Sequence, residues 1–194
     1  MEIKLLDCTV DPLYIIGACA RTCYQSEDKN SVKVREDFYR GLIKREHTAP
    51  IEFVWTVWDI KDVSRICAAQ IMRHRIASYC MESQRYCDSS EKEFVFPFKA
   101  LETDDSCIDF VKKCQNFYKK LVKAGVPRED ARYFLPQGVT CNLKIGMNLR
   151  SLRNFLKLRL DKSAQWEIRS LAKEMHAIIS EKWPVLLEDI KNDI

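Results

Sequence analysis

The sequence has few histidines and no Cys-x-x-Cys motif. Its 194 residues include three histidines, and none of its nine cysteines forms a Cys-x-x-Cys arrangement. Zinc fingers and ribbons need clustered thiolate and imidazole ligands, so the sequence predicts no metal site. An odd number of cysteines without a secretory signal favours reduced thiols, which serve as small buried hydrophobic side chains.

Long hydrophobic runs are also absent. No apolar stretch approaches the roughly 20 residues that a membrane-spanning helix needs. The N-terminus, Met-Glu-Ile-Lys, lacks the hydrophobic core of a signal peptide. We therefore expect a cytoplasmic protein with no membrane partner. Linkers, repeats and low-complexity tracts are missing as well, so a single domain is predicted over residues 1–194.

What is present is the composition of a globular protein with a moderate positive charge. Hydrophobic residues make up 46% of the chain and charged residues 31%, which argues against an intrinsically disordered chain. The net charge of +4 suits an anionic small molecule but is too small for a dedicated nucleic-acid binder. A basic module that binds RNA or DNA is therefore the weaker alternative, and no nucleic-acid partner is predicted.

Hydrophobic periodicity and capping residues predict both strands and helices. Residues 2–10 and 51–60 are expected to form strands, because apolar, β-branched and aromatic residues dominate them. Asp11 followed by Pro12 is expected to begin a helix. Further helices are predicted over residues 31–45, 63–71, 105–124 and 148–160, in a short helix from Pro127 that bears Arg132, and in a last helix capped by Asp161 or Ser163. One α+β domain is the economical conclusion.

The densest group of polar functional side chains lies between Arg73 and Tyr86. This segment begins with Arg-His-Arg at residues 73–75, and seven residues later comes Ser-Gln-Arg at residues 83–85. Forked guanidinium groups and short hydroxyls hold phosphate oxygens and the edges of planar heterocycles. The alternative is a basic surface turn, although a solvated patch would more often be rich in lysine.

Two polar residues fall on helix faces that are otherwise apolar. Gln70 lies seven residues after Val63, so its amide needs either backbone partners in the core or a ligand. Arg159 shares a stripe with Leu152 and Phe155, because successive helical residues are about 100° apart. A guanidinium group there needs a carboxylate, a phosphate or a polarised carbonyl. The alternatives are an internal ion pair and a side chain that extends past the stripe into water.

The segment of residues 73–85 resembles the signature of the flavin-dependent thymidylate synthases (ThyX). Three other blocks of the chain resemble the same family, in the expected order. They are His-x-x-Pro-x-Glu at residues 47–52, Pro-Arg-Glu-x-Ala-Arg at residues 127–132, and a C-terminal block at residues 148–159 and 164–168. Together the resemblance covers most of the chain from Ala20 to Ile168.

This resemblance implies a fold and a reaction. The expected fold is the ThyX-like α+β fold, in which a mixed or antiparallel sheet packs with long α-helices. The expected reaction converts dUMP to dTMP, with 5,10-methylenetetrahydrofolate as the carbon donor and with FAD, reduced by NADPH, as the source of hydride. Family members are homotetramers whose active sites combine residues from several subunits, so a homotetramer is expected here.

The resemblance also assigns residues to ligands. Arg159 is expected to be catalytic, because the matching arginine of the family polarises the uracil ring and eases loss of its N–H proton. The expected FAD-binding residues are His47, Ala49, Arg73, His74, Arg75, Met81, Asn148, Arg150 and Asn154. The expected dUMP-binding residues are Gln70, Arg73, Ser83, Gln84, Arg85, Arg132 and Arg159.

The chain departs from the family pattern at a few positions. Cys80 and Met81 replace the usual Asn-Glu, and Phe53 and Ser163 stand where histidine is common. Glu82 would face the opposite side of an extended segment. These departures motivate one alternative, a non-catalytic relative that binds flavin or nucleotide. The thiol-based reaction of the classical thymidylate synthases is not supported, because the chain has no Pro-Cys dipeptide.

Overall fold

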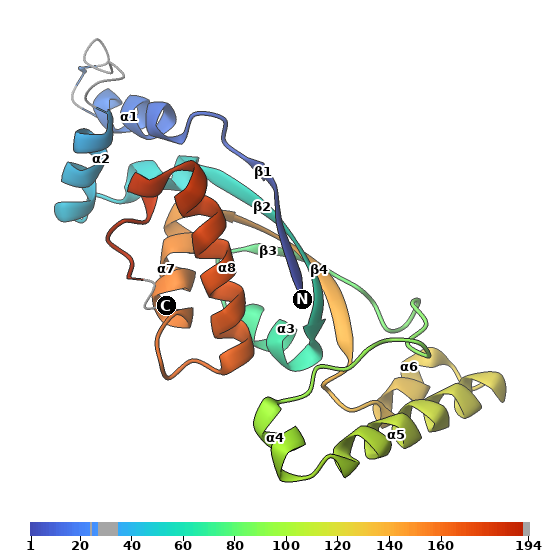
Figure 1. The fold of residues 1–194 in the computed structure, drawn as a ribbon. Coiled ribbons are helices and arrows are strands. Elements are labelled where there is room, and N and C mark those ends of the chain that lie inside the picture. The colour runs from blue at the N-terminus through green and yellow to red at the C-terminus, as the bar shows by residue number, and fades with distance from the viewer. Residues whose placement is uncertain (24, 27–34, 192–194) are drawn as a thin grey trace. The chain divides into compact units, whose positions relative to one another are not determined.

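The computed structural model describes residues 1–23, 25–26 and 35–191 (Figure 1). The chain divides into two compact units. Unit 1 consists of Met1–Glu2, Ile60–Met72 and Cys80–Leu143. Unit 2 consists of Ile3–Asp59, Arg73–Tyr79 and Lys144–Ile194. The segments of the two units alternate along the chain. The expectation of one domain over residues 1–194 stays a prediction.

One four-stranded sheet runs through the described chain. Its strands are paired in the order β1-β2-β4-β3, and their bounds are β1 (Glu2–Cys8), β2 (Trp55–Ser64), β3 (Ser78–Met81) and β4 (Thr140–Asn148). The carbonyl of Trp55, at the start of β2, accepts a hydrogen bond from the N–H of Thr9, just after β1 (3.1 Å). The hydroxyl of Thr56 donates to the carbonyl of Met147 at the end of β4 (3.0 Å). Neighbouring strands therefore run antiparallel, as the expected fold class requires.

Unit 2 contains the long C-terminal helices. Its helical elements are α1 (Pro12–Thr22), α2 (Arg35–Lys44), the 3-10 helix η3 (Ala49–Phe53), α7 (Leu149–Arg159), α8 (Trp166–Lys182) and the 3-10 helix η5 (Pro184–Leu186). α1 begins as predicted, with the Asp11 carboxylate accepting from the N–H of Tyr14 (2.9 Å) and Pro12 in the first turn. α7 and α8 lie side by side (Figure 1), and Leu152 and Phe155 of α7 and Leu171 of α8 are fully buried.

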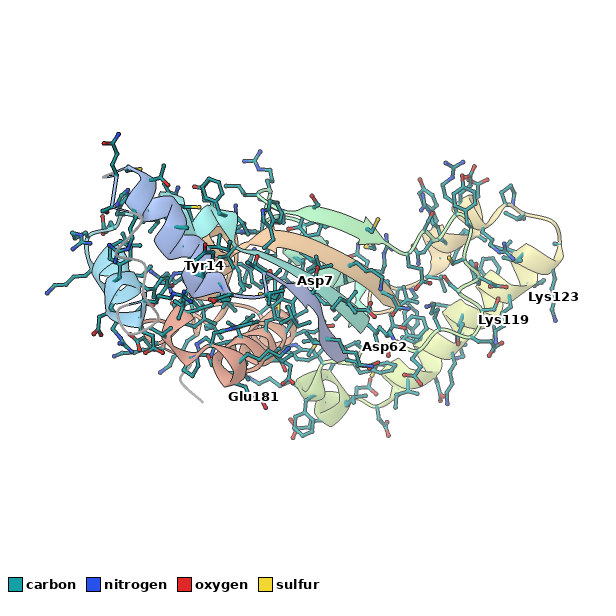
Figure 2. All side chains as sticks on the ribbon, turned by 90° about the horizontal axis from the view of Figure 1, so that it is seen from above. Asp7, Tyr14, Asp62, Lys119, Lys123 and Glu181 are labelled. Atoms are coloured by element: carbon teal, nitrogen blue, oxygen red, sulfur yellow. The ribbon has the colours of Figure 1, made fainter. Side chains whose placement is uncertain are left out.

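Unit 1 contains the remaining helices. They are α3 (Arg65–Ile71), α4 (Phe98–Thr103), α5 (Ser106–Lys123), α6 (Arg128–Ala131) and the 3-10 helix η4 (Arg132–Phe134). α5 lies against α6 and η4, with Tyr118 and Leu135 in a shared hydrophobic cluster. Its polar side carries Lys119 and Lys123 (Figure 2). α5 ends as predicted, because Gly125 adopts φ 87°, a conformation that glycine tolerates best.

Several sequence predictions need correction. Residues 51–60 are not one strand: Pro50 lies in the first turn of η3, which continues to Phe53, and the backbone becomes extended only from Val54. The last helix is capped by Gln165 and not by Asp161 or Ser163, because the Gln165 side chain accepts from the N–H of Ile168 (3.2 Å). Arg132 lies in η4, directly after α6.

Other elements agree with the sequence or were not predicted from it. The helices at residues 63–71, 105–124 and 148–160 are present with ends shifted by a few residues. The predicted helix at residues 31–45 corresponds to α2 from residue 35, and residues 31–34 lie outside the described residues. Strands β3 and β4 and helix α4 were not predicted. Among the described residues, no helix has both the length and the apolar character needed to cross a membrane.

Candidate functional site

A cavity of ≈ 490 Å³ lies in unit 2, where the start of α7 meets η3 and the segment after α3. It is lined by Glu52, His74, Ile76, Asn148, Arg150, Ser151 and Asn154. Four of these residues, namely His74, Asn148, Arg150 and Asn154, were predicted from the sequence to bind FAD. The structure therefore brings together residues from three of the blocks that carry the family resemblance.

The N-terminus of α7 is held at this cavity by local hydrogen bonds. The side chain of Asn148 caps the helix by accepting from the N–H of Ser151 (2.8 Å). The N–H of Leu149 donates to the carbonyl of Val54 (2.8 Å), which ties the helix start to the end of η3. Unpaired N–H groups at a helix start carry partial positive charge, so this end of the cavity favours an anionic or electron-rich group.

Arg150 and Asn154 project from the same side of α7, one turn apart. Both are exposed, and both line the cavity. Arg150 forms an ion pair with Glu52 of η3, whose side chain is about as exposed as that of Arg150. Exposed pairs of this kind contribute little stability, so the guanidinium group can exchange Glu52 for a ligand at small cost. Glu52 belongs to the His-x-x-Pro-x-Glu block but was not predicted as a site residue.

His74 is the buried member of the Arg-His-Arg segment. It is 8% exposed, and its ring packs edge-to-face on Phe155 with 5.6 Å between ring centroids. Its Nε2 lies 2.7 Å from the hydroxyl oxygen of Ser151. Burial and the nearby charge of Arg159 lower the pKa of His74, although a hydrogen bond with the backbone of Ser151 opposes this. His74 is therefore neutral at pH 7 and offers hydrogen bonds rather than charge.

Two hydroxyl groups fix the backbone around His74. The Tyr79 hydroxyl donates to the carbonyl of His74, and the Ser151 hydroxyl donates to the carbonyl of Ile76. Arg73 and Arg75 are exposed on either side of the buried histidine, and within the described residues neither lines the cavity. The segment is thus rigid at its centre and presents two guanidinium groups outward.

A second cavity of unit 2 shares two residues with the first. Its volume is ≈ 420 Å³, and its lining includes Arg150, Asn154, Lys157 and Thr48. The predicted FAD-binding residues His47 and Ala49 flank Thr48, and they are partly buried and exposed respectively. The structure places them next to this lining but not in it.

Arg159, the predicted catalytic residue, lies in the last turn of α7 and is partly buried. Its charge lowers the pKa of His74 and opposes the burial that raises the pKa of Tyr79, so the guanidinium lies close to both side chains. The fully buried arginine of α7 is Arg153, which is 5% exposed and was not singled out from the sequence.

Most of the predicted dUMP-binding residues belong to unit 1. These are Gln70, Ser83, Gln84, Arg85 and Arg132, whereas Arg73 and Arg159 belong to unit 2. A cavity of ≈ 470 Å³ in unit 1 is lined by Arg65, Ala69, Gln84, Arg132, Tyr133, Leu135, Gln137 and Val139. It therefore contains two of the predicted residues, and it adds Arg65 and Gln137, which the sequence reasoning missed.

The other predicted residues of unit 1, namely Gln70, Ser83 and Arg85, are not part of this lining. Arg85 is exposed, forms an ion pair with Glu129, and lies 5.6 Å from the ring centroid of Tyr86. The hydroxyl of Ser83 accepts from the N–H of Arg85 (3.3 Å). Arg132 donates to the carbonyl of Glu129 (3.0 Å), so one short segment anchors both arginines. Gln70 is partly buried on α3.

Two of the positions that depart from the family pattern, Cys80 and Met81, lie at the end of β3. Met81, the last residue of the strand, is partly buried in unit 1. The following residue, Glu82, continues the pairing through its N–H, which donates to the carbonyl of Asn142 (2.9 Å). Its carboxylate accepts a charged hydrogen bond from Lys92 (2.8 Å). Glu82 is therefore already engaged within unit 1.

Within residues 1–23, 25–26 and 35–191, no three His, Cys, Asp or Glu side chains gather closely enough to hold a metal ion. The polar groups that line the ≈ 470 Å³ cavity of unit 1 and the ≈ 490 Å³ cavity of unit 2 are amides, guanidinium groups, two hydroxyls, a neutral imidazole and the carboxylate of Glu52. Such groups suit organic ligands that carry phosphates and heterocycles.

Comparisons with known proteins find similarity to one protein family. A family model described as "Thymidylate synthase complementing protein" matches residues 4–185. The flavin-dependent thymidylate synthase of Geobacter sulfurreducens is 34% identical, over 97% of this chain and 86% of its own length. That of Pyrococcus abyssi is 35% identical, over 90% of this chain and 77% of its own. The structure of the Helicobacter pylori enzyme ThyX with FAD and dUMP superposes with a TM-score of 0.82 at 26% identity, over 98% of this chain and 99% of that one.

Proposed function

Because this chain belongs to the flavin-dependent thymidylate synthase family, we propose that it methylates dUMP reductively to give dTMP, with FAD as its cofactor. The observation that carries the proposal is the cavity of unit 2. Residues that are far apart in the sequence, and that the family resemblance assigns to flavin, line it together: His74, Asn148, Arg150 and Asn154.

The lining of this cavity fits a flavin dinucleotide. FAD combines an anionic diphosphate with a planar ring whose edge alternates hydrogen-bond donors and acceptors. Arg150 and the start of α7 would hold negative charge and carbonyl oxygens. The amide of Asn154 can donate and accept at once, and the neutral ring of His74 adds one further hydrogen bond. When bound, FAD would supply the hydride that no amino-acid side chain can supply.

The cavity of unit 1 fits a pyrimidine monophosphate. Arg65 and Arg132 provide two permanent positive charges for a phosphate, and Arg132 is already oriented by its bond to the Glu129 carbonyl. Gln84 and Gln137 provide amides that can pair with the donors and acceptors of a uracil edge. Gln70, Ser83 and Arg85 would complete the nucleotide site from adjacent segments.

Arg159 is the proposed catalytic residue. A guanidinium group stays protonated throughout catalysis, so it can stabilise the negative charge that develops on a uracil carbonyl when the ring N–H proton is lost. Its charge already acts on the buried His74 and on the partly buried Tyr79. Arg73, from the same unit, would contact both FAD and dUMP, and Arg75, Met81, His47 and Ala49 would contribute to the FAD site.

The remaining parts of the proposal concern co-substrates and assembly. We infer that 5,10-methylenetetrahydrofolate donates the carbon unit and that NADPH reduces the flavin, as the family resemblance implies. A homotetramer is proposed because the family resemblance implies it, and because the segment of residues 73–85 is too dense in arginine for one small subunit to neutralise by itself. We propose a cytoplasmic location, where NADPH is available to reduce the flavin.

A non-catalytic relative that binds flavin and nucleotide is the second candidate. It is motivated by Met81 at a position where the family has a carboxylate, and by Glu82, whose carboxylate is engaged by Lys92. Two experiments separate the candidates. The absorbance spectrum of the isolated protein, with and without dUMP, reports flavin and its response to nucleotide. Growth of a thymidine-requiring host on the cloned gene then supports the enzyme, whereas a yellow, dUMP-responsive protein that fails to support growth supports the non-catalytic relative.

A further inference from the structure

The hydroxyl of Ser151 lies between two groups of the segment after α3. Its oxygen is 2.7 Å from Nε2 of His74, and it also forms a hydrogen bond with the backbone carbonyl of Ile76. All three residues line the cavity of unit 2. Ser151 is 5% exposed, so water does not compete freely for these bonds.

Counting protons decides the direction of both hydrogen bonds. A carbonyl oxygen can only accept, so the single hydroxyl hydrogen of Ser151 is given to Ile76. The Ser151 oxygen must then accept from His74, and this requires a proton on Nε2. Since His74 is neutral at pH 7, its other nitrogen, Nδ1, carries a lone pair. Nδ1 forms no hydrogen bond with any residue that the structure describes.

We propose that Ser151 is a positioning residue for the cofactor: it holds His74 in the Nε2–H form, so that Nδ1 accepts a hydrogen bond from an N–H or O–H group of the bound flavin dinucleotide. This inference rests on the proposed function, because it names FAD as the ligand of the cavity. Ser151 acts through His74 and is not itself a catalytic residue.

The tautomer determines which groups the cavity accepts at this point. A flavin dinucleotide carries a ring N–H, the hydroxyl groups of its ribityl and ribose parts, and the amino group of adenine, all of which donate. An Nδ1 lone pair attracts such a donor, whereas an Nδ1–H would place two donors against each other in a poorly solvated site. The serine hydroxyl thus determines which ring nitrogen of His74, 77 positions away in the sequence, donates a hydrogen bond and which one accepts.

The same hydroxyl also steadies the arginines of the segment. By holding the carbonyl of Ile76 and the ring of His74 together, it restrains the backbone that carries Arg73 and Arg75. A Ser151→Ala variant loses both hydrogen bonds, whereas a Ser151→Thr variant keeps a hydroxyl. His74→Gln is the complementary change, since glutamine can still donate to Ser151 but has no lone pair at the position of Nδ1.

The first test is nuclear magnetic resonance of the FAD-free protein with 15N-labelled histidine. The chain has three histidines, so His74→Gln assigns the signal by its disappearance. We expect His74 to be protonated on Nε2 only, to become a mixture of tautomers in Ser151→Ala, and to recover in Ser151→Thr. A wild-type His74 that is protonated on Nδ1, or on both nitrogens at pH 7, would overturn the inference whether or not any variant folds.

The second test is titration of the same proteins with FAD. Loss of one neutral hydrogen bond should weaken FAD binding roughly 2- to 10-fold in both Ser151→Ala and His74→Gln. Ser170→Ala, an exposed serine on α8, is the matched control and should bind like the wild type. Unchanged affinity in His74→Gln would refute the acceptor role even in an active enzyme. A wild-type protein with the expected tautomer but no FAD binding would instead refute the proposed function, and with it FAD as the ligand of Nδ1.

Discussion

Replacing the buried Arg153 with methionine should destabilise unit 2 substantially. The Arg153 guanidinium donates to the hydroxyl of Tyr39 (3.1 Å), to the carbonyl of Leu186, and to the carboxylate of Asp189 (2.5 Å). These bonds tie α7 to α2 and to the C-terminal segment. Methionine retains much of the buried volume, so the change removes the charge and its hydrogen bonds with little loss of packing.

The size of the effect follows from what each partner loses. Breaking a fully buried ion pair costs about 3–5 kcal/mol, but the Asp189 side chain is 35% exposed and can be partly solvated. The carbonyl of Leu186 keeps its bond from Tyr39 (2.8 Å), so it is not left without a partner. The loss should therefore resemble that of one charge-assisted hydrogen bond with partial burial, about 2–3 kcal/mol. For a chain of this size that corresponds to a Tm lower by about 4–12 °C.

Thermal and urea unfolding, followed by circular dichroism at equal protein concentration and without FAD, measures this loss. Lys157→Met is the matched control, because Lys157 lies 4.0 Å from the same carboxylate but its side chain is 58% exposed. The control should change stability by less than about 1 kcal/mol. The reasoning is refuted if Arg153→Met unfolds within about 0.5 kcal/mol of the wild type, or if the control is equally destabilised.

Three further predictions concern the site and its pH dependence. Arg150→Ala should weaken FAD binding roughly 10- to 150-fold, as expected for one charge-assisted hydrogen bond, and unchanged flavin titration would contradict its role. Arg159→Ala should abolish dTMP formation while FAD stays bound; normal turnover would remove its catalytic assignment. Burial raises the pKa of Asp189, but the hydrogen bond and charge of Arg153 outweigh this and lower it. The stability that this carboxylate contributes is therefore fully present above its unfolded-state pKa of about 3.9, and it is lost as the pH falls through the lower folded-state pKa. Acid titration of unfolding should show a weaker pH dependence in Arg153→Met than in the wild type.

The elements that could be predicted are those with local signals. Asp11 and Pro12 identify the start of α1, and Gly125 identifies the end of α5, because capping depends on a few neighbouring residues. β4 carries a usable signal that was overlooked: Cys141 and Leu143 begin an alternation of buried apolar residues that continues to the end of the strand. β3 has four residues and becomes a strand only through its partner, so no local pattern could predict it.

The candidate site divides in the same way. The motif blocks identified His74, Asn148, Arg150 and Asn154 because their spacing is characteristic. Ser151 was missed, since its hydroxyl finds its partners 75 and 77 residues away, and no short-range pattern reports such a contact. Helical periodicity identified Arg159 on α7 as a polar residue on an apolar stripe. The more deeply buried arginine of this helix is Arg153, and its carboxylate partner, Asp189, lies 36 residues further along the chain, beyond the reach of any short-range pattern.

The most direct test of the central claim is a single reaction followed to its product. Purified protein is mixed under anaerobic conditions with FAD, dUMP, 5,10-methylenetetrahydrofolate and NADPH, and dTMP is quantified by mass spectrometry together with NADPH consumed. The account predicts one dTMP for each NADPH and no product when either FAD or dUMP is omitted. A protein that binds FAD and dUMP and oxidises NADPH, yet forms no dTMP, would contradict it.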